Sequence, residues 1–453
     1  MGRDARNIPL TGTTPAALEH YERAVVQYHS FVGDCIDTID TALAEAPAFV
    51  MGHLFKAISL VMFSEQRYMP QARASVAAAE ALAAGANARE RLLTRAARLL
   101  VDGEWDAASQ ALDRVLVDDP LDSFTIQSAH LMDFLRGDAL NLRNRVSRVL
   151  PHWSPAVPGY SYVLSMHAFG LEECNQYAEA EDTARRALAI EPKDAWGVHA
   201  VAHVMEMQGR MDEGIAWLES RERDWAPDNA FAVHNWWHLA LFNLDRQRHR
   251  RVLELYDTRL YPEPVDDALV LLDATALLWR LHLDDVPLGA RAHTLADAWE
   301  RKLDEERGYY AFNDFHAMLA LVMAERDAAA GRLMADVEHT AEHGAGLNRV
   351  MTQQAGLPLC RAVQAFGAGR YGDAAELIAP ARDTANRFGG SHAQRDILTL
   401  TLIEAAIRDG RPAVARHYLG ERLTHKPASG TGWRLLARAE APPTAGAAVR
   451  AAA

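Results

Sequence analysis

A motif about thirty-four residues long recurs along this chain, and it constrains the fold more than any other feature. Its clearest copy, starting at the sequence MHAFGLEE, places small, aromatic and helix-stopping residues at fixed intervals: Ala168, Tyr177, Ala180, Ala187 and Pro192. Two antiparallel helices can approach closely where Ala replaces a larger side chain, and an aromatic ring fills the gap beside the turn. Proline ends the second helix because it has no backbone N–H to donate.

The same register returns in GEWDAASQALDRVLVDDP, QGRMDEGIAWL and GAGRYGDAAELIAP, and the pattern resembles the tetratricopeptide repeat. Weaker copies begin near Phe49, Ser123, Phe231, Asp266, Phe312 and Asp396. We predict an all-α fold in which about ten antiparallel helix pairs form one tetratricopeptide-like superhelical solenoid over residues 1–435. Residues 436–453 are rich in Ala and Pro, and we expect a disordered tail there. Ligands of such solenoids lie on the concave face, which the first helix of each pair lines.

Composition narrows the classes of partner. The 453 residues carry 47 basic and 61 acidic side chains, a formal charge of −14. Nucleic acids and anionic membranes attract positively charged surfaces, so we expect neither as a partner. The basic run RQRHRR, residues 246–251, is the main local exception, and helical spacing assigns it to a solvated face.

Cysteine usage and the absence of targeting features favour a cytoplasmic protein. The three cysteines, Cys35, Cys174 and Cys360, are far apart and form no CxxC pair, so neither a disulfide framework nor a thiolate zinc site is indicated. The start MGRDARNIPL lacks the apolar core of a signal peptide. No run reaches the roughly 20 apolar residues that span a bilayer.

Two short motifs have structural explanations. GAGRYG, residues 367–372, matches the dinucleotide-binding pattern GxGxxG, but no strand precedes it and its glycines fall at a turn between helices. SHAQ, residues 391–394, has the spacing of a helix capping box, with Ser391 at the cap and Gln394 three residues later.

Two histidine pairs are the main candidates for chemistry. His199 and His203 are four residues apart, and His234 and His238 repeat that spacing on the next first helix. Residues at i and i+4 share one helix face, and packed helices are about 8–10 Å apart, so the imidazoles can converge on one ion. Imidazole is a ligand for Zn, Fe, Cu and Ni. Glu206 and Glu172 are the candidates for a further ligand or a catalytic base.

The spacing leaves three readings open. HxxxH lacks the built-in glutamate of HExxH, so it is a less specific metal motif. The four histidines can instead hydrogen-bond across packed helices, or line a groove for an organic ligand or acidic peptide without a metal.

Further polar and aromatic residues fall on predicted first helices, and we assign them to the ligand groove: His167, Glu173, Trp196, Trp236, Asp314, His316, His392 and Arg395. Two segments exceed the minimal repeat, around residues 153–160 and 342–356, and we expect them to cap or narrow that groove.

The motifs MHAFGLEE, AWGVHAVAHVMEMQGRMDEGIAWL, HNWWHLAL and GGSHAQRD together resemble the tetratricopeptide-repeat protein 38 family, whose bacterial members are also called StaR-like. The resemblance spans most of the chain. It implies an all-helical repeat fold and supplies no established reaction. Some bacterial relatives are associated with natural-product pathways, so a role in substrate binding or catalysis is one implication.

The leading functional hypothesis is a repeat protein that binds a small molecule, a peptide or a metal-associated substrate in a groove rich in His and Glu. One alternative is a non-catalytic adaptor that grips a partner protein. Another is a metalloenzyme with histidine ligands, in which the metal activates water or substrate.

Overall fold

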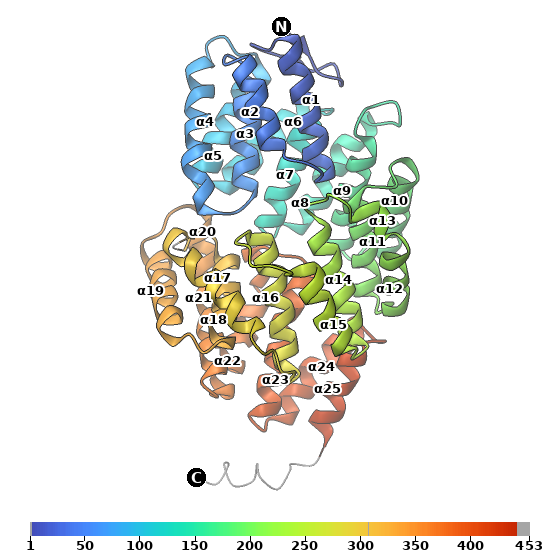
Figure 1. Ribbon diagram of the computed structural model, residues 1–453, viewed down its shortest axis with the longest axis vertical. Helices are drawn as coiled ribbons and strands as arrows, with labels where there is room; N and C mark the ends of the chain where they lie inside the picture. The colour runs from blue at the N-terminus through green and yellow to red at the C-terminus, as the bar shows by residue number, and fades with distance from the viewer. Residues whose placement is uncertain (1, 307, 442–453) are drawn as a thin grey trace. The chain divides into compact units, whose positions relative to one another are not determined.

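The computed structural model describes residues 2–306 and 308–441, and the predicted all-α, tetratricopeptide-like architecture is confirmed (Figure 1). The described strands are β1 (Gly2–Arg3) and β2 (Pro9–Leu10), which pair antiparallel with Gly2 opposite Leu10. The helices group into two compact units. The first unit comprises Met1–Val204, Ser220–Asn235 and Gly344–Arg349, and the second comprises Met205–Glu219, Trp236–His343 and Val350–Ala453.

Consecutive helices of the first unit pair in chain order. The pairs are α1 (Pro15–Ser30) with α2 (Cys35–Glu45), α3 (Val50–Met62) with α4 (Met69–Leu82), α5 (Ala88–Val101) with α6 (Trp105–Asp118), α7 (Ser123–Leu135) with α8 (Ala139–Val149), and α9 (Tyr160–Glu173) with α10 (Tyr177–Ile190). The first unit also has three short elements: η1 (Gln66–Tyr68) precedes α4, η2 (Leu150–His152) precedes α9, and α13 (Glu222–Trp225) follows α10 further along the chain.

The second unit continues the same order. Its pairs are α16 (Ala268–Leu283) with α17 (Arg291–Glu306), α18 (Ala311–Met323) with α19 (Asp327–His343), α21 (Leu357–Gly367) with α22 (Tyr371–Arg382), and α23 (His392–Arg408) with α24 (Pro412–His425), followed by α25 (Gly430–Glu440). Shorter elements of this unit are α15 (His249–Leu255), η3 (Tyr256–Leu260), η4 (Thr352–Gly356) and η5 (Ala385–Phe388).

Four helices cross a boundary between the ranges of the two units. They are α11 (Ala195–Met207), α12 (Met211–Ser220), α14 (Ala232–Asp245) and α20 (Gly346–Met351).

The small residues of the repeat lie where neighbouring helices contact each other, as the repeat pattern predicts. Ala180 and Ala187 on α10 are fully buried. Gly170 on α9 lies against the backbone of α8, where an added Cβ would come within 2.5 Å of Leu142 and Arg143 main-chain atoms. At this point α8 and α9 approach as closely as their backbones allow.

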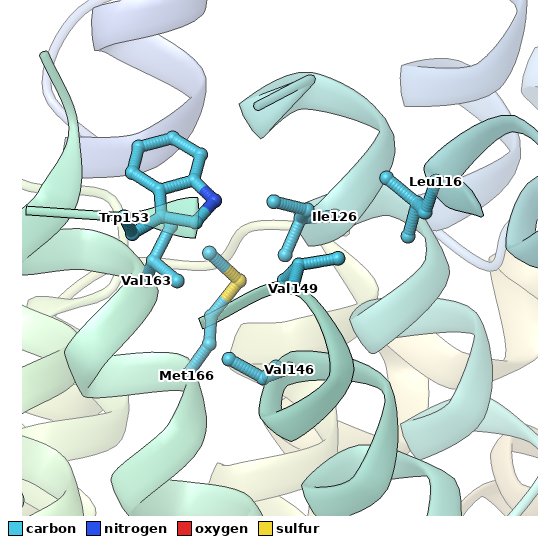
Figure 2. Close-up of a cluster of buried hydrophobic side chains, with 7 residues drawn as sticks. All are labelled: Leu116, Ile126, Val146, Val149, Trp153, Val163 and Met166. Carbon is cyan, nitrogen blue, oxygen red and sulfur yellow. The ribbon is translucent and has the colours of Figure 1, made fainter. Parts of the chain in front are cut away.

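The first longer segment, around residues 153–160, contributes to the core instead of capping a groove. Trp153 packs in a buried cluster that comprises Leu116, Ile126, Val146, Val149, Trp153, Val163 and Met166 (Figure 2). Its indole N–H donates to the Pro120 carbonyl at 2.9 Å. The expectation that this segment narrows a groove is therefore wrong for Trp153, because burial of its large apolar ring is the stronger effect.

The second longer segment, around residues 342–356, includes Gly344–Arg349, which belong to the first unit. The backbone N–H of Leu347 donates to the Gly103 carbonyl at 3.0 Å, at the turn between α5 and α6. Gly346 has φ of +62°, and a Cβ there would lie 2.4 Å from the Gly103 oxygen. Glycine is needed at this contact because other residues rarely adopt a positive φ, and because a side chain would clash with the Gly103 backbone.

The tail expected over residues 436–453 overlaps helix α25. Helix α25 extends to Glu440, so residues 436–440 are helical, and residues 442–453 lie outside the described residues.

Cys360 is buried, and Cys35 and Cys174 are half-buried free thiols. Within the described part of the chain, no helix has the length and apolarity needed to cross a membrane.

Candidate functional site

A buried carboxylate determines where the helix carrying His199 and His203 begins. Asp194 Oδ1 accepts the backbone N–H groups of Trp196 and Gly197 at 3.0 and 3.1 Å, which caps the first turn of α11. The Ser165 hydroxyl on α9 donates to the other carboxylate oxygen at 2.6 Å. Burial raises the pKa of Asp194 to about 7. The cap thus fixes α11 to α9 at a defined register.

The start of α14, which carries His234, is held by a segment almost two hundred residues earlier. The N–H of Ala230 donates to the Phe31 carbonyl at 2.9 Å, and the Asn229 amide donates to the Ser30 carbonyl at 3.0 Å. Phe31 ends α1 in the left-handed conformation, with φ of +60°. The turn after α1 therefore positions the loop that precedes α14.

Three histidines of the first unit converge. Nitrogen atoms of His199, His203 and His234 lie within 4.8 Å of one another, and each residue is at most 5% exposed. The ring centroids are 4.3 Å apart for His199 and His203, and 4.9 Å apart for His199 and His234. The predicted i, i+4 spacing on α11 thus brings two imidazoles together, and α14 adds a third.

Two carboxylates from the last turn of α9 adjoin this group. Glu172, Glu173 and His203 each offer a ligand atom within 4.8 Å of the other two. Glu172 Oε2 lies 3.3 Å from His203 Nδ1, and both side chains are fully buried. Burial together with the charges of Glu172 and Glu173 raises the pKa of nearby Tyr177 to about 12.

Aromatic rings enclose the three histidines. Phe169 from α9 lies 5.3 Å from His199 and 5.2 Å from His203, measured between ring centroids. The Phe231 ring is 5.0 Å from His199, and the Trp196 ring is 5.2 Å from it. These rings limit access of water to the imidazoles, which strengthens any electrostatic interaction there.

The second unit holds the fourth histidine of the predicted pairs. His238 follows His234 by one turn on α14, and its Nδ1 donates to Glu206 Oε2 at 2.9 Å. Because the carboxylate accepts at Nδ1, the His238 tautomer keeps its lone pair on Nε2. The Lys426 ammonium donates to the other Glu206 oxygen at 3.4 Å. Glu206 is therefore an orienting partner of His238.

Two of the predicted groove residues have other partners. His167 Nε2 lies 3.0 Å from the Ser147 hydroxyl of α8, and burial lowers the pKa of His167 to about 4. The contact with α8 removes His167 from the group formed by His199, His203 and His234. In the second unit, the Arg259 guanidinium lies over the Trp236 ring, 4.9 Å from its centroid.

Four further predicted groove residues, Asp314, His316, His392 and Arg395, belong to the second unit. Burial raises the pKa of Asp314 well above its usual range and lowers the pKa of His316 to about 4. His316 Nδ1 lies 2.8 Å from the Phe312 carbonyl of its own helix. Arg395 donates to the Gly390 carbonyl and to His392 Nδ1, at 3.4 Å for the histidine. Asp314 and His316 therefore belong to helix α18, and His392 and Arg395 belong to the first turn of α23.

Sequence reasoning missed three residues that shape the site: Asp194, Phe169 and Phe231. A helix-cap pattern was available for Asp194, which precedes the apolar periodicity of α11. Phe169 and Phe231 are ordinary apolar residues in the sequence, and only packing shows that they surround His199.

No family profile matches the chain. Among solved structures, the human IFIT1 dimer with m7Gppp-AAAA matches at 14% identity and TM-score 0.45, covering 96% of this chain and 94% of that one. The IFIT1 dimer with PPP-AAAA matches at 14% identity and TM-score 0.42, covering 89% and 91%. Yeast Tom70 matches at 11% identity and TM-score 0.34, covering 96% and 88%. These similarities are too weak to carry an argument about function, and the narrower resemblance to the tetratricopeptide-repeat protein 38 family stays a prediction from the motifs.

Proposed function

We propose that this tetratricopeptide-like protein binds a divalent transition-metal ion through His199, His203 and His234. The observation that carries the proposal is the convergence of three buried imidazoles whose nitrogens lie within 4.8 Å of one another. Ligand nitrogens about 2.0–2.1 Å from a tetrahedral ion lie about 3.3 Å apart, so small side-chain rotations suffice to close the site. Zn, Fe, Cu and Ni all accept imidazole ligands.

The carboxylate beside His203 supports a metal more than it supports simple core packing. Metal-ligating histidines commonly direct one ring nitrogen at a carboxylate while the other binds the ion. Glu172 lies 3.3 Å from His203 Nδ1, which leaves Nε2 for a metal. Glu173 adds negative charge beside the cation.

His238, the fourth histidine of the predicted pairs, belongs to the second unit. It follows His234 by one turn on the same helix, and residues with this spacing share a helix face. Glu206 holds its Nδ1 at 2.9 Å, so Nε2 is available in the same manner as for His203. The same orienting device thus recurs on two of the four predicted ligands.

A metal at this site would act as a Lewis acid on a bound water or substrate. Glu172 and Glu206 would hold Nδ1 of His203 and His238, and so orient Nε2 of each ring toward the ion. The aromatic rings of Phe169 and Phe231 would keep bulk water from the ion.

The test is elemental analysis of untagged protein purified without chelator or nickel resin. We expect close to one equivalent of Zn, Fe, Cu or Ni in the wild type and loss of that ion in a His199→Ala/His203→Ala variant. A matched control is His339→Ala/His343→Ala, because these histidines form an exposed pair with the same spacing on α19, with ring centroids 5.0 Å apart. The control variant should keep the ion.

Two results would contradict the proposal. One is a wild-type protein that stays metal-free after incubation with each of the four ions. The other is an unchanged metal content in the His199→Ala/His203→Ala variant. Either result would favour hydrogen bonding among the histidines, or a ligand without a metal.

A further inference from the structure

A pocket lies wholly within the second unit, and of the residues proposed for the metal site only Glu206 is part of its lining. It encloses about 590 Å³ of empty space when its open mouth is included. Its walls combine aliphatic side chains with charged ones. The aliphatic lining comes from Met211, Leu241, Leu244, Leu283, Leu400 and Leu435.

The carboxylates of this pocket already have cationic or hydrogen-bonding partners. Asp396 receives two hydrogen bonds from Arg422, at 2.9 and 3.2 Å. Glu404 is bound by Arg408 and Arg438 at 2.7 and 2.8 Å. These pairs neutralise the acidic part of the lining.

The other three acids of the lining also have partners, and Asp284 accepts from the Arg434 guanidinium. Asp245 accepts from the Ser429 hydroxyl at 2.6 Å and from the backbone N–H of Gly430 at 2.9 Å. Glu206 accepts from His238 at 2.9 Å.

Arg280 differs in its partners from the other two basic residues of the lining, Arg422 and Lys426. It is 4% exposed, and its guanidinium donates to two backbone carbonyls, those of Ala276 and Ala393, at 2.9 Å each. Its charge also lies over the Trp237 ring, 5.3 Å from the centroid. Throughout residues 2–306 and 308–441, no carboxylate oxygen lies within 4.0 Å of this guanidinium. Burial lowers the Arg280 pKa, while the more distant carboxylates of Asp396, Glu206 and Asp273 act in the opposite direction.

We propose that this pocket binds a small carboxylic acid with an aliphatic body, whose carboxylate pairs with Arg280. The planar guanidinium fork matches a carboxylate in a bidentate geometry, and such charge-assisted pairs are among the strongest hydrogen bonds in proteins. The leucines and Met211 supply the apolar surface that an aliphatic chain would cover.

The lining favours a single carboxylate over a phosphate. Arg422 is already committed to Asp396, and Lys426 lies 3.4 and 3.6 Å from Glu206 and Asp396, respectively. Among the basic residues that line the pocket, Arg280 alone has no carboxylate within 4.0 Å in the described part of the chain, which suits one negative charge. A phosphate group carries more charge and usually needs several cations or backbone N–H groups.

The experiment is calorimetric titration of the full-length protein with hexanoate and, separately, with hexanamide. Hexanoate should bind saturably at one site. The uncharged amide should bind at least about tenfold more weakly, because a charge-assisted hydrogen bond contributes about 1.5–3 kcal/mol and 1.4 kcal/mol corresponds to tenfold.

Variants locate the binding. Arg280→Met should weaken hexanoate binding at least about tenfold. Arg382→Met should bind like the wild type, since Arg382 pairs with Glu421 at 2.7 Å and does not line the pocket. The proposal is overturned by wild-type protein that does not bind hexanoate, by equal binding of acid and amide, or by full affinity in Arg280→Met. If Arg280→Met does not fold, the comparison of acid with amide on the wild type still decides the question.

Discussion

At the scale of single residues, burial keeps several histidines uncharged. It lowers the pKa of His29 and His316 to about 4, and that of His130 to about 3. A histidine in the unfolded chain has a pKa of about 6.5. Between about pH 6.5 and pH 4, these histidines therefore bind protons in the unfolded chain but not in the folded chain. Each such residue makes the folded state less stable as the pH falls through that window.

We expect His316→Gln to reduce this acid sensitivity. Replacing one histidine that titrates only in the unfolded chain removes up to about 1.4 kcal/mol per pH unit from the slope of unfolding free energy against pH. The measurement is urea denaturation of wild type and variant at half-unit steps from pH 4 to 7.5. The difference between them should be constant above pH 6.5 and shift in favour of the variant below it. Parallel curves over the whole range would show that His316 does not contribute.

The contact of Glu172 with His203 allows a second prediction at this scale. A Glu172→Gln substitution keeps the shape and removes the negative charge that orients the ring. Loss of such a partner typically weakens metal affinity 10–100-fold. Competition with a chromogenic chelator would measure the affinity for Zn²⁺. Affinity equal to that of the wild type would mean that Glu172 does not support a metal ligand.

At the scale of helices, the approach of α9 to α8 depends on the missing side chain at Gly170. A Gly170→Ala substitution would place Cβ 2.5 Å from backbone atoms of Leu142 and Arg143, which cannot move as a flexible side chain can. We expect a loss of about 1–3 kcal/mol in the free energy of unfolding. Urea denaturation followed by circular dichroism measures it.

The matched control is Gly331→Ala on α19. No atom lies within 4 Å of a Cβ built at Gly331, and that position is exposed. Alanine there should stabilise the protein by about 0.5–1 kcal/mol, because glycine loses more conformational freedom on folding. If both substitutions had the same sign, the packing argument for Gly170 would fail.

The capping box of α23 illustrates how local sequence defines an element. The Ser391 hydroxyl accepts the Gln394 N–H at 3.2 Å, and the Gln394 side chain accepts the Ser391 N–H at 2.9 Å. This confirms the prediction from SHAQ. Ser391→Ala should cost about 1 kcal/mol of unfolding free energy, measurable by the same urea titration, while Ser391→Asp should retain most of it because aspartate also caps helices.

At the scale of the whole molecule, a metal ion bound only by the folded state would raise thermal stability. At a free metal concentration 100-fold above the dissociation constant, the gain is about 2.7 kcal/mol. We expect a chelator to lower the melting temperature of the wild type and leave that of His199→Ala/His203→Ala unchanged. Scanning calorimetry with and without the chelator measures both. If the chelator lowered both melting temperatures equally, its effect would not arise from metal bound by these histidines.

The sequence alone determined the features that depend on residues close together in the chain. Small and aromatic residues at repeat spacing predicted the helix pairs, proline and capping residues predicted helix ends, and the four-residue spacing predicted that His199 and His203 share a face. These predictions succeed because helical periodicity and cap hydrogen bonds are local.

Only the tertiary structure decided which distant residues meet. The turn at Phe31 holds the loop before α14, Trp153 fills a core instead of capping a groove, and Arg280 is buried without a carboxylate partner. Each outcome depends on how side chains far apart in sequence share buried space, and composition and periodicity do not encode that sharing. The same holds for the site itself: spacing aligned two histidines, and packing brought His234 and Glu172 to them.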